Sequence, residues 1–120
     1  GWRAELPNVD LTTGEWGVVA PRPSAVLATF TTLGVKEAAG FGAPAASPAR
    51  IRVSDAEGWL ADFAGLAHIR RAGRLLFVEA TANDVRTVAR LRSALPPLEP
   101  RGNAWCVDGS TVMRVQWPPV

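Results

Sequence analysis

Apolar and polar residues along the chain form some stretches with strand periodicity and others with helical spacing. Three apolar stretches, rich in Val, Thr, Trp or Phe, precede residue 40: 2–6, 15–20 and 25–33. The first two are predicted strands, bounded by turn-forming residues. The third is ambiguous, since Ser24 could cap a helix, but its three threonines favour an extended chain followed by a short helix near 35–39.

The segment GFGAPAASPA, residues 40–49, is the one low-complexity part of the chain. It has no charge and little that could pack, so it is predicted to be a loop or linker. The net charges on its two sides differ too little to indicate two domains. We therefore expect one globular domain over 1–120, with an N-terminal strand region at 1–39, this loop, and an α/β region at 50–120.

Helical spacing begins just after an alternating stretch at 49–54 that predicts a strand. Ser54 and Glu57 match a capping box, so a helix is expected to start at Asp55 and to end near Gly73. Five apolar residues fall on one side of this helix and are predicted to face the core: Trp59, Leu60, Phe63, Leu66 and Ala67. Residues 74–80 are apolar on both faces, which is typical of an interior strand.

A second helix is predicted from the N-cap Thr81 through Leu95, where two prolines end it. The last elements are two alternating runs around Asp108-Gly109, a strong hairpin signal. The order after the loop is therefore strand, helix, strand, helix, strand, strand. This order predicts an α+β or α/β fold, a small two-layer sandwich of a mixed sheet and two helices in a ferredoxin-like style.

The composition indicates the general class of the protein but does not identify a function. With 48% apolar and 20% charged residues the chain is expected to be globular, and no apolar stretch reaches the roughly 20 residues of a membrane helix. Arginine, alanine, glycine and proline are abundant, which is typical of a GC-rich bacterial genome. The chain begins with Gly1 and ends in WPPV, so we expect a soluble piece of a larger bacterial protein, in an unknown compartment.

No catalytic or metal-binding constellation is visible in the sequence. One cysteine and one histidine cannot build a disulfide framework or a zinc site, and no cofactor is predicted. His68 is expected to face water at a helix end without a carboxylate at helical spacing, and Cys106 to be a small buried hydrophobe. A small enzyme or ligand-binding domain is a further alternative. Its site would combine arginines with carboxylates such as Asp62, Glu79 or Asp84, which the fold would have to bring together from distant parts of the sequence.

The final hairpin carries the leading functional hypothesis. With a turn at Asp108-Gly109, Cys106 lies opposite Thr111, and Trp105 lies opposite Val112 and diagonal to Arg114. One face then holds the predicted protein-binding residues Trp105, Val107, Arg114 and Gln116, and the other holds Cys106 and Met113. The face that carries Arg114 and Gln116 is expected to be the less buried one, which would leave Trp105 exposed; the alternative is that helices or the N-terminal strands cover it and make Trp105 a core residue. Tryptophan and arginine are enriched at binding hot spots. The sequence thus favours a non-catalytic protein-interaction or assembly domain that binds a protein partner or itself, with the 74–80 strand as a further edge.

Nucleic-acid binding is the alternative hypothesis. Its candidate residues are Arg70, Arg71, Arg74, Arg86 and Arg90. Arginine clusters can neutralise phosphates, but the net charge is only +2, and 74–80 has a single Phe where stacking residues would be needed.

Overall fold

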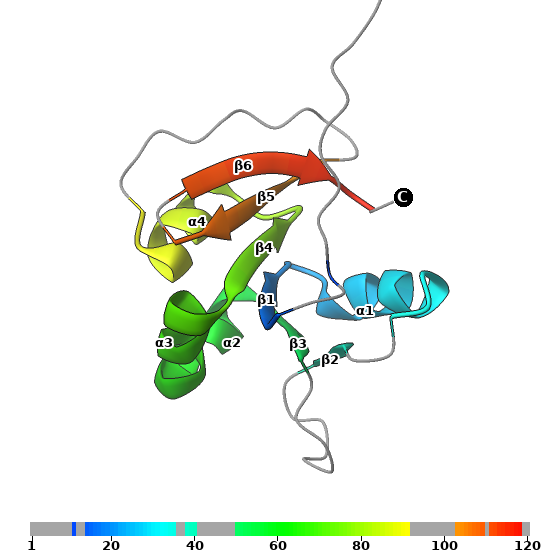
Figure 1. Ribbon diagram of the computed structural model, residues 1–120, viewed down its shortest axis with the longest axis horizontal. Coiled ribbons are helices and arrows are strands. Elements are labelled where there is room, and N and C mark those ends of the chain that lie inside the picture. The colour runs from blue at the N-terminus through cyan, green and yellow to red at the C-terminus, as the bar shows by residue number, and fades with distance from the viewer. Residues whose placement is uncertain are drawn as a thin grey trace, which may run out of the picture.

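The computed structural model describes Leu11 and residues 14–35, 38–40, 50–91, 103–109 and 111–118. Within them, six strands and four helices follow one another along the chain (Figure 1). They are β1 (Trp16–Val19), α1 (Pro23–Thr32), β2 (Ala38–Gly40), β3 (Ile51–Ser54), α2 (Ala56–Ala61), α3 (Phe63–Ala72), β4 (Arg74–Val78), α4 (Ala82–Ala89), β5 (Asn103–Asp108) and β6 (Thr111–Gln116). The predictions for residues 2–6, 41–49 and 92–95 fall outside the described residues.

The strands form one mixed sheet in the order β2-β3-β1-β4-β5-β6, so the expected mixed sheet packed with helices is confirmed. The first four strands in this order are parallel, and β5 and β6 are antiparallel to their neighbours. Parallel strands that follow one another in the chain require crossover connections. Helix α1 lies in the crossover from β1 to β2, and α2 with α3 in the crossover from β3 to β4, and each of these crossovers passes over one intervening strand of the sheet. The 74–80 segment therefore provides an interior strand, as its apolar pattern predicted, and offers no free sheet edge.

Helices cover both faces of the sheet (Figure 1). On one face, Val26 and Phe30 of α1 pack with the central strands. On the other face, residues of α2, α3 and α4 form a second core cluster with Leu75, Phe77 and Trp105. Alternate residues of β4 enter the two clusters, which explains why this strand is apolar on both sides.

Trp59 of α2 is the anchor of the second cluster. Its side chain is fully buried, and its indole Nε1 donates a hydrogen bond of 2.9 Å to the carbonyl oxygen of Val18 in β1. Gly17 makes this approach possible, because a Cβ there would lie 3.0 Å from the Trp59 ring and from Leu75 Cδ2. A glycine in a central strand thus marks a close packing contact.

The extended conformation expected for 25–33 is wrong, because this segment is helix α1. Proline at the first helical position suits the helix start, where no backbone N–H donor is needed. The hydroxyls of Thr29, Thr31 and Thr32 each donate 3.1 Å hydrogen bonds to the carbonyl four residues earlier. Inside a helix these threonines therefore satisfy their hydroxyls locally, and burial of Val26 and Phe30 outweighs their weak helix propensity.

The single helix predicted from Asp55 is two helices. Asp55, rather than Ser54, is the N-cap of α2 and accepts a 2.8 Å hydrogen bond from Gly58 N. The helical path breaks at Asp62, whose carboxylate caps α3 by accepting from Gly65 N. Because the break changes the direction of the side chains that follow it, Phe63 is 78% exposed. Leu60 lies before the break, in α2, and is 39% exposed. The predicted place of both residues in the core is wrong.

The later elements follow the sequence closely, with two corrections. The capping box of Thr81 and Asp84 opens α4, but the helix ends at Ala89, and Arg90 takes a left-handed conformation with φ 57°. In the hairpin, Asp108 is not part of the turn but pairs with Thr111, as the last pair of the two strands before the turn. This shift moves the partners of each residue by two positions and therefore leaves every side chain on its predicted face.

Candidate functional site

The hairpin face predicted to be open is covered. Trp105 is only 6% exposed, because α4 returns across this face and packs Val85 and Val88 in the same cluster as the indole. The expectation of an exposed Trp105 is therefore wrong. In the observed register it pairs with Arg114 rather than Val112.

The other predicted binding residues of the hairpin are also partly or fully covered. Val107 is buried, while Arg114 and Gln116 are half-buried. Cys106 is buried as expected, and burial raises the pKa of its thiol to about 11, while the charge of Arg74 lowers this pKa and that of Asp108 raises it. Met113, expected to point inward, is 43% exposed.

The five arginines of the nucleic-acid hypothesis do not form one patch. Arg70 donates from Nε to the Val88 carbonyl oxygen at 2.8 Å, and burial, followed by repulsion from Arg90, lowers its pKa. Arg86 and Arg90 are exposed on and just after α4. Arg71 and Arg74 lie instead where α3 ends and β4 begins, and there they line a hollow of the surface.

Two adjoining hollows form a groove along the amino ends of β3, β1 and β4, which we call the amino-edge groove. Their volumes are about 230 and 250 Å³, and they share Glu15 and Trp16. The first also holds Arg50, Arg52 and His68, and the second holds Arg71, Arg74 and Asp108. Arg50 and Arg52 have no local sequence signal of a site, because only the pairing of β3 with β1 brings them to the same hollow as Glu15 and His68.

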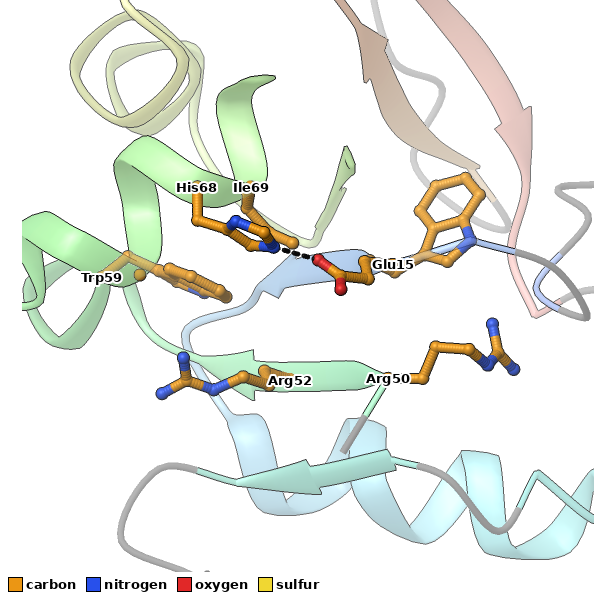
Figure 2. A pocket seen from close by; sticks show the side chains of 8 residues that line it. Glu15, Arg50, Arg52, Trp59, His68 and Ile69 are labelled. Atoms are coloured by element: carbon orange, nitrogen blue, oxygen red, sulfur yellow. Dashed lines mark hydrogen bonds and ion pairs between the residues drawn. The ribbon is translucent and has the colours of Figure 1, made fainter. Parts of the chain in front are cut away.

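His68 meets a carboxylate that local spacing could not reveal. Its Nε2 forms a hydrogen bond with Glu15, which precedes β1 and lies 53 residues earlier (Figure 2). An imidazole beside a carboxylate is a common catalytic arrangement. Among the described residues that line this hollow there is no Ser, Thr or Cys that such an imidazole could activate.

Two arginines of the groove are stacked on tryptophans. The guanidinium carbon of Arg52 lies 5.7 Å from the Trp59 ring centroid, and that of Arg74 lies 5.4 Å from the Trp16 ring centroid. Each also faces an acidic side chain at 3.4 Å, Asp62 for Arg52 and Asp108 for Arg74. These contacts exceed the roughly 2.7–2.9 Å of a tight charge-assisted hydrogen bond, so both ion pairs are loose.

Next to this groove, the break between α2 and α3 exposes a small apolar surface, which we call the elbow patch. It consists of Leu60, Ala61, Phe63 and Ala64, all exposed. Asp62 lies within the patch and pairs with Arg52, and Gly65 lines the first hollow. The patch and the groove are therefore continuous along the chain.

The carboxylates considered for a ligand site lie in three separate places. Asp62 is at the elbow, Asp84 caps α4, and Glu79 forms a 2.9 Å ion pair with Arg22 at the carboxyl end of the parallel strands. Glu79 has a positive φ of 55°, which is uncommon for a residue other than glycine. The structure thus brings each acid to a different partner and does not gather them.

Comparisons with protein-family models, with curated proteins and with solved structures each return no match for this chain. Over the described residues, no helix combines the length and the apolar character needed to cross a membrane. No three His, Cys, Asp or Glu side chains lie together as possible metal ligands in that part of the chain.

Proposed function

We propose that this domain is a non-catalytic protein-interaction domain and that the elbow patch is its contact surface. The proposal keeps the function favoured by the sequence but moves the contact from the hairpin to the α2–α3 break. The observation that carries it is the 78% exposure of Phe63.

Burial of the exposed Phe63 side chain by a partner would contribute favourably to the free energy of binding. Complete burial of a phenylalanine side chain contributes about 1.5–3 kcal/mol, and aromatic residues are enriched at the centre of interfaces. The neighbouring Ala61 and Ala64 are small and exposed, so a partner can approach the ring closely. Asp62 and Arg52 supply a polar rim of the sort that surrounds such contacts.

A phenylalanine of this exposure adds little to the stability of the isolated domain. Capping by Asp62 accounts for the α2–α3 break, and the core of this region is filled by Trp59 and Leu66. The position of Phe63 is therefore better explained by contact with another molecule than by packing within the chain.

Site-specific photo-crosslinking in the cells that produce the protein tests the proposal. A benzophenone-bearing phenylalanine would replace Phe63 in one variant and the exposed Arg86 of α4 in a control variant. We expect a discrete covalent adduct with one protein from position 63 and none from position 86. A second variant, Phe63→Ser with the crosslinker at position 60, should lose that adduct while keeping its melting temperature.

The proposal is wrong if position 63 yields no protein adduct, or if both positions give the same set of adducts. It is also wrong if Phe63→Ser leaves the adduct from position 60 unchanged, since the ring would then contribute nothing to association.

A further inference from the structure

We propose that this chain self-associates through strand β6, whose outer edge pairs antiparallel with β6 of a second copy and so joins the two sheets. The inference goes beyond the elbow patch and does not depend on it, because β6 lies at one end of the sheet and the patch lies on the α2–α3 break. It starts from the place of β6 as a terminal strand of the sheet, at the end opposite β2 (Figure 1).

The first step is the hydrogen-bonding capacity of the β6 edge. In the part of the chain that the structure describes, β6 pairs with β5 alone, so the backbone N–H and C=O groups on its other side point away from the sheet. A row of such groups at strand spacing is matched by the backbone of another extended strand. The chemistry of the edge therefore favours a strand as its partner.

The second step is that β6 carries few of the features that keep edge strands from pairing. Natural edge strands are protected by proline, lysine, bulges or short length. Residues 111–116 contain no proline and no lysine, and each of the six pairs one-to-one with a residue of β5, without a bulge. The other terminal strand, β2, has only three residues. Of the two ends of the sheet, β6 therefore offers the longer and more regular edge.

The third step is that β6 can complement itself. Two copies of the strand can pair antiparallel about a two-fold axis perpendicular to the sheet, which presents the same residues from both sides. Side chains on one face of the joined sheet must then lie opposite each other, so the axis passes through a single residue of β6. An axis at Arg114 would place two arginines directly opposite, and like charges in that position are destabilising. An axis at Met113 avoids this contact and pairs residues 111–115 of each copy, with Arg114 opposite Val112.

Met113 suits the position on this axis. Its side chain is 43% exposed, although its pairing partner Cys106 on β5 and the next residue on its own face, Val115, are both buried. In the paired form the two Met113 side chains would lie opposite each other, with Cβ atoms about 4.5–5.5 Å apart, and each would cover the other. Methionine is flexible and fills irregular contacts well. The exposed thioether is thus explained by contact with a second copy.

Sedimentation velocity of the purified chain over a wide range of concentrations tests the inference. We expect a dimer whose fraction rises with concentration. Met113→Lys and Met113→Glu should each weaken dimer formation roughly tenfold, because like charges then face each other in place of two apolar side chains. An equimolar mixture of these two variants should restore the dimer, since the opposed charges then attract. Met113→Gln is the matched control, polar but neutral, and should weaken the dimer less than either charge.

Disulfide formation locates the axis independently. Both cysteine variants are made in a Cys106→Ala background, because Cys106 pairs with Met113 within the hairpin and would otherwise react with the new thiol. Met113→Cys should then give a disulfide-linked dimer under mild oxidation, since opposed residues of paired strands lie within the reach of a disulfide. Thr111→Cys is the control on the same face of β6. Its two copies would lie roughly 13 Å apart along the strands and should crosslink far less.

Several results would overturn the inference. One is a monomer at every concentration, and another is a dimer that Met113→Lys and Met113→Gln weaken equally. A third is no recovery in the mixture of charge variants, and a fourth is equal crosslinking of Thr111→Cys and Met113→Cys. Should the charge variants unfold, the two cysteine variants decide. Phe63→Ser should leave the dimer unchanged, and its loss in that variant would place self-association at the elbow patch and reject the β6 edge. An adduct from position 63 with a chain that stays monomeric would reject β6 pairing and leave the proposed function standing.

Discussion

Replacing Trp105 by alanine tests the central structural correction, the burial of this indole. Trp105 is 6% exposed and lies in the cluster that contains Val85 and Val88 of α4. Within the sheet it pairs with Phe77 on one side and Arg114 on the other. The space left by alanine is therefore bounded by strands and by a helix, and these cannot close it without moving.

We expect Trp105→Ala to lower the free energy of unfolding by about 3–5 kcal/mol, the usual cost of removing a large aromatic side chain from a core. A domain of this size has a total stability of roughly 5–15 kcal/mol, so the variant would keep its fold with a much reduced margin. The melting temperature should fall by about 10–20 °C.

Urea denaturation followed by circular dichroism at 222 nm measures this loss. Met113→Ala is a control in the same hairpin, because Met113 is 43% exposed and its removal should cost less than about 1 kcal/mol. If Trp105→Ala lost no more than Met113→Ala, the indole would not be a core residue and the packing of α4 described above would be refuted.

Three further changes test other contacts. Gly17→Ala should destabilise the domain by about 1–3 kcal/mol in thermal melts, since its Cβ would lie 3.0 Å from the Trp59 ring; unchanged stability would contradict this packing. Thr81→Ala should cost about 1 kcal/mol through loss of the α4 capping box, and Thr81→Ser should restore most of it. The Cys106 thiol, with its pKa raised from 9.0 to about 11, should resist iodoacetamide at pH 8 in the folded protein. Because the folded pKa is the higher one, this group contributes stability that is complete below pH 9 and lost as pH rises toward 11. Cys106→Ala should abolish that part of the pH dependence in urea titrations, and rapid alkylation at pH 8 would show that the thiol is not buried.

Features that depend on a few neighbouring residues were predictable from the chain. The strand at 74–80, the Thr81 cap and the two-stranded hairpin each follow from local periodicity or from a single turn. The grouping of the hairpin residues into two faces was also right, because side chains alternate along a strand whichever partner the strand takes, but which residues are exposed was not.

The predictions from local sequence were wrong at α1 and at the α2–α3 break, where two features of the local sequence favoured different structures. The threonines of α1 lower helix propensity, yet within the helix their hydroxyls bond to earlier carbonyls. At the α2–α3 break, helical spacing predicted that Phe63 faces the core, but the Asp62 carboxylate caps a new helix and restarts the spacing. In both places a side chain forms a hydrogen bond with the backbone, and this bond determines where a helix forms or begins. Predictions from helix propensity or from the helical spacing of apolar residues take no account of such bonds.

The sequence by itself determined the element types of the described residues after position 50 and the alternation of side chains along the strands, because these properties depend on residues a few positions apart. Only the tertiary structure decided that α4 covers Trp105, that His68 meets Glu15, and that Arg52 and Arg74 flank one strand. The physical reason is that burial and charge pairing depend on which surfaces are packed together, and parallel strands bring together residues that the chain separates by whole helices.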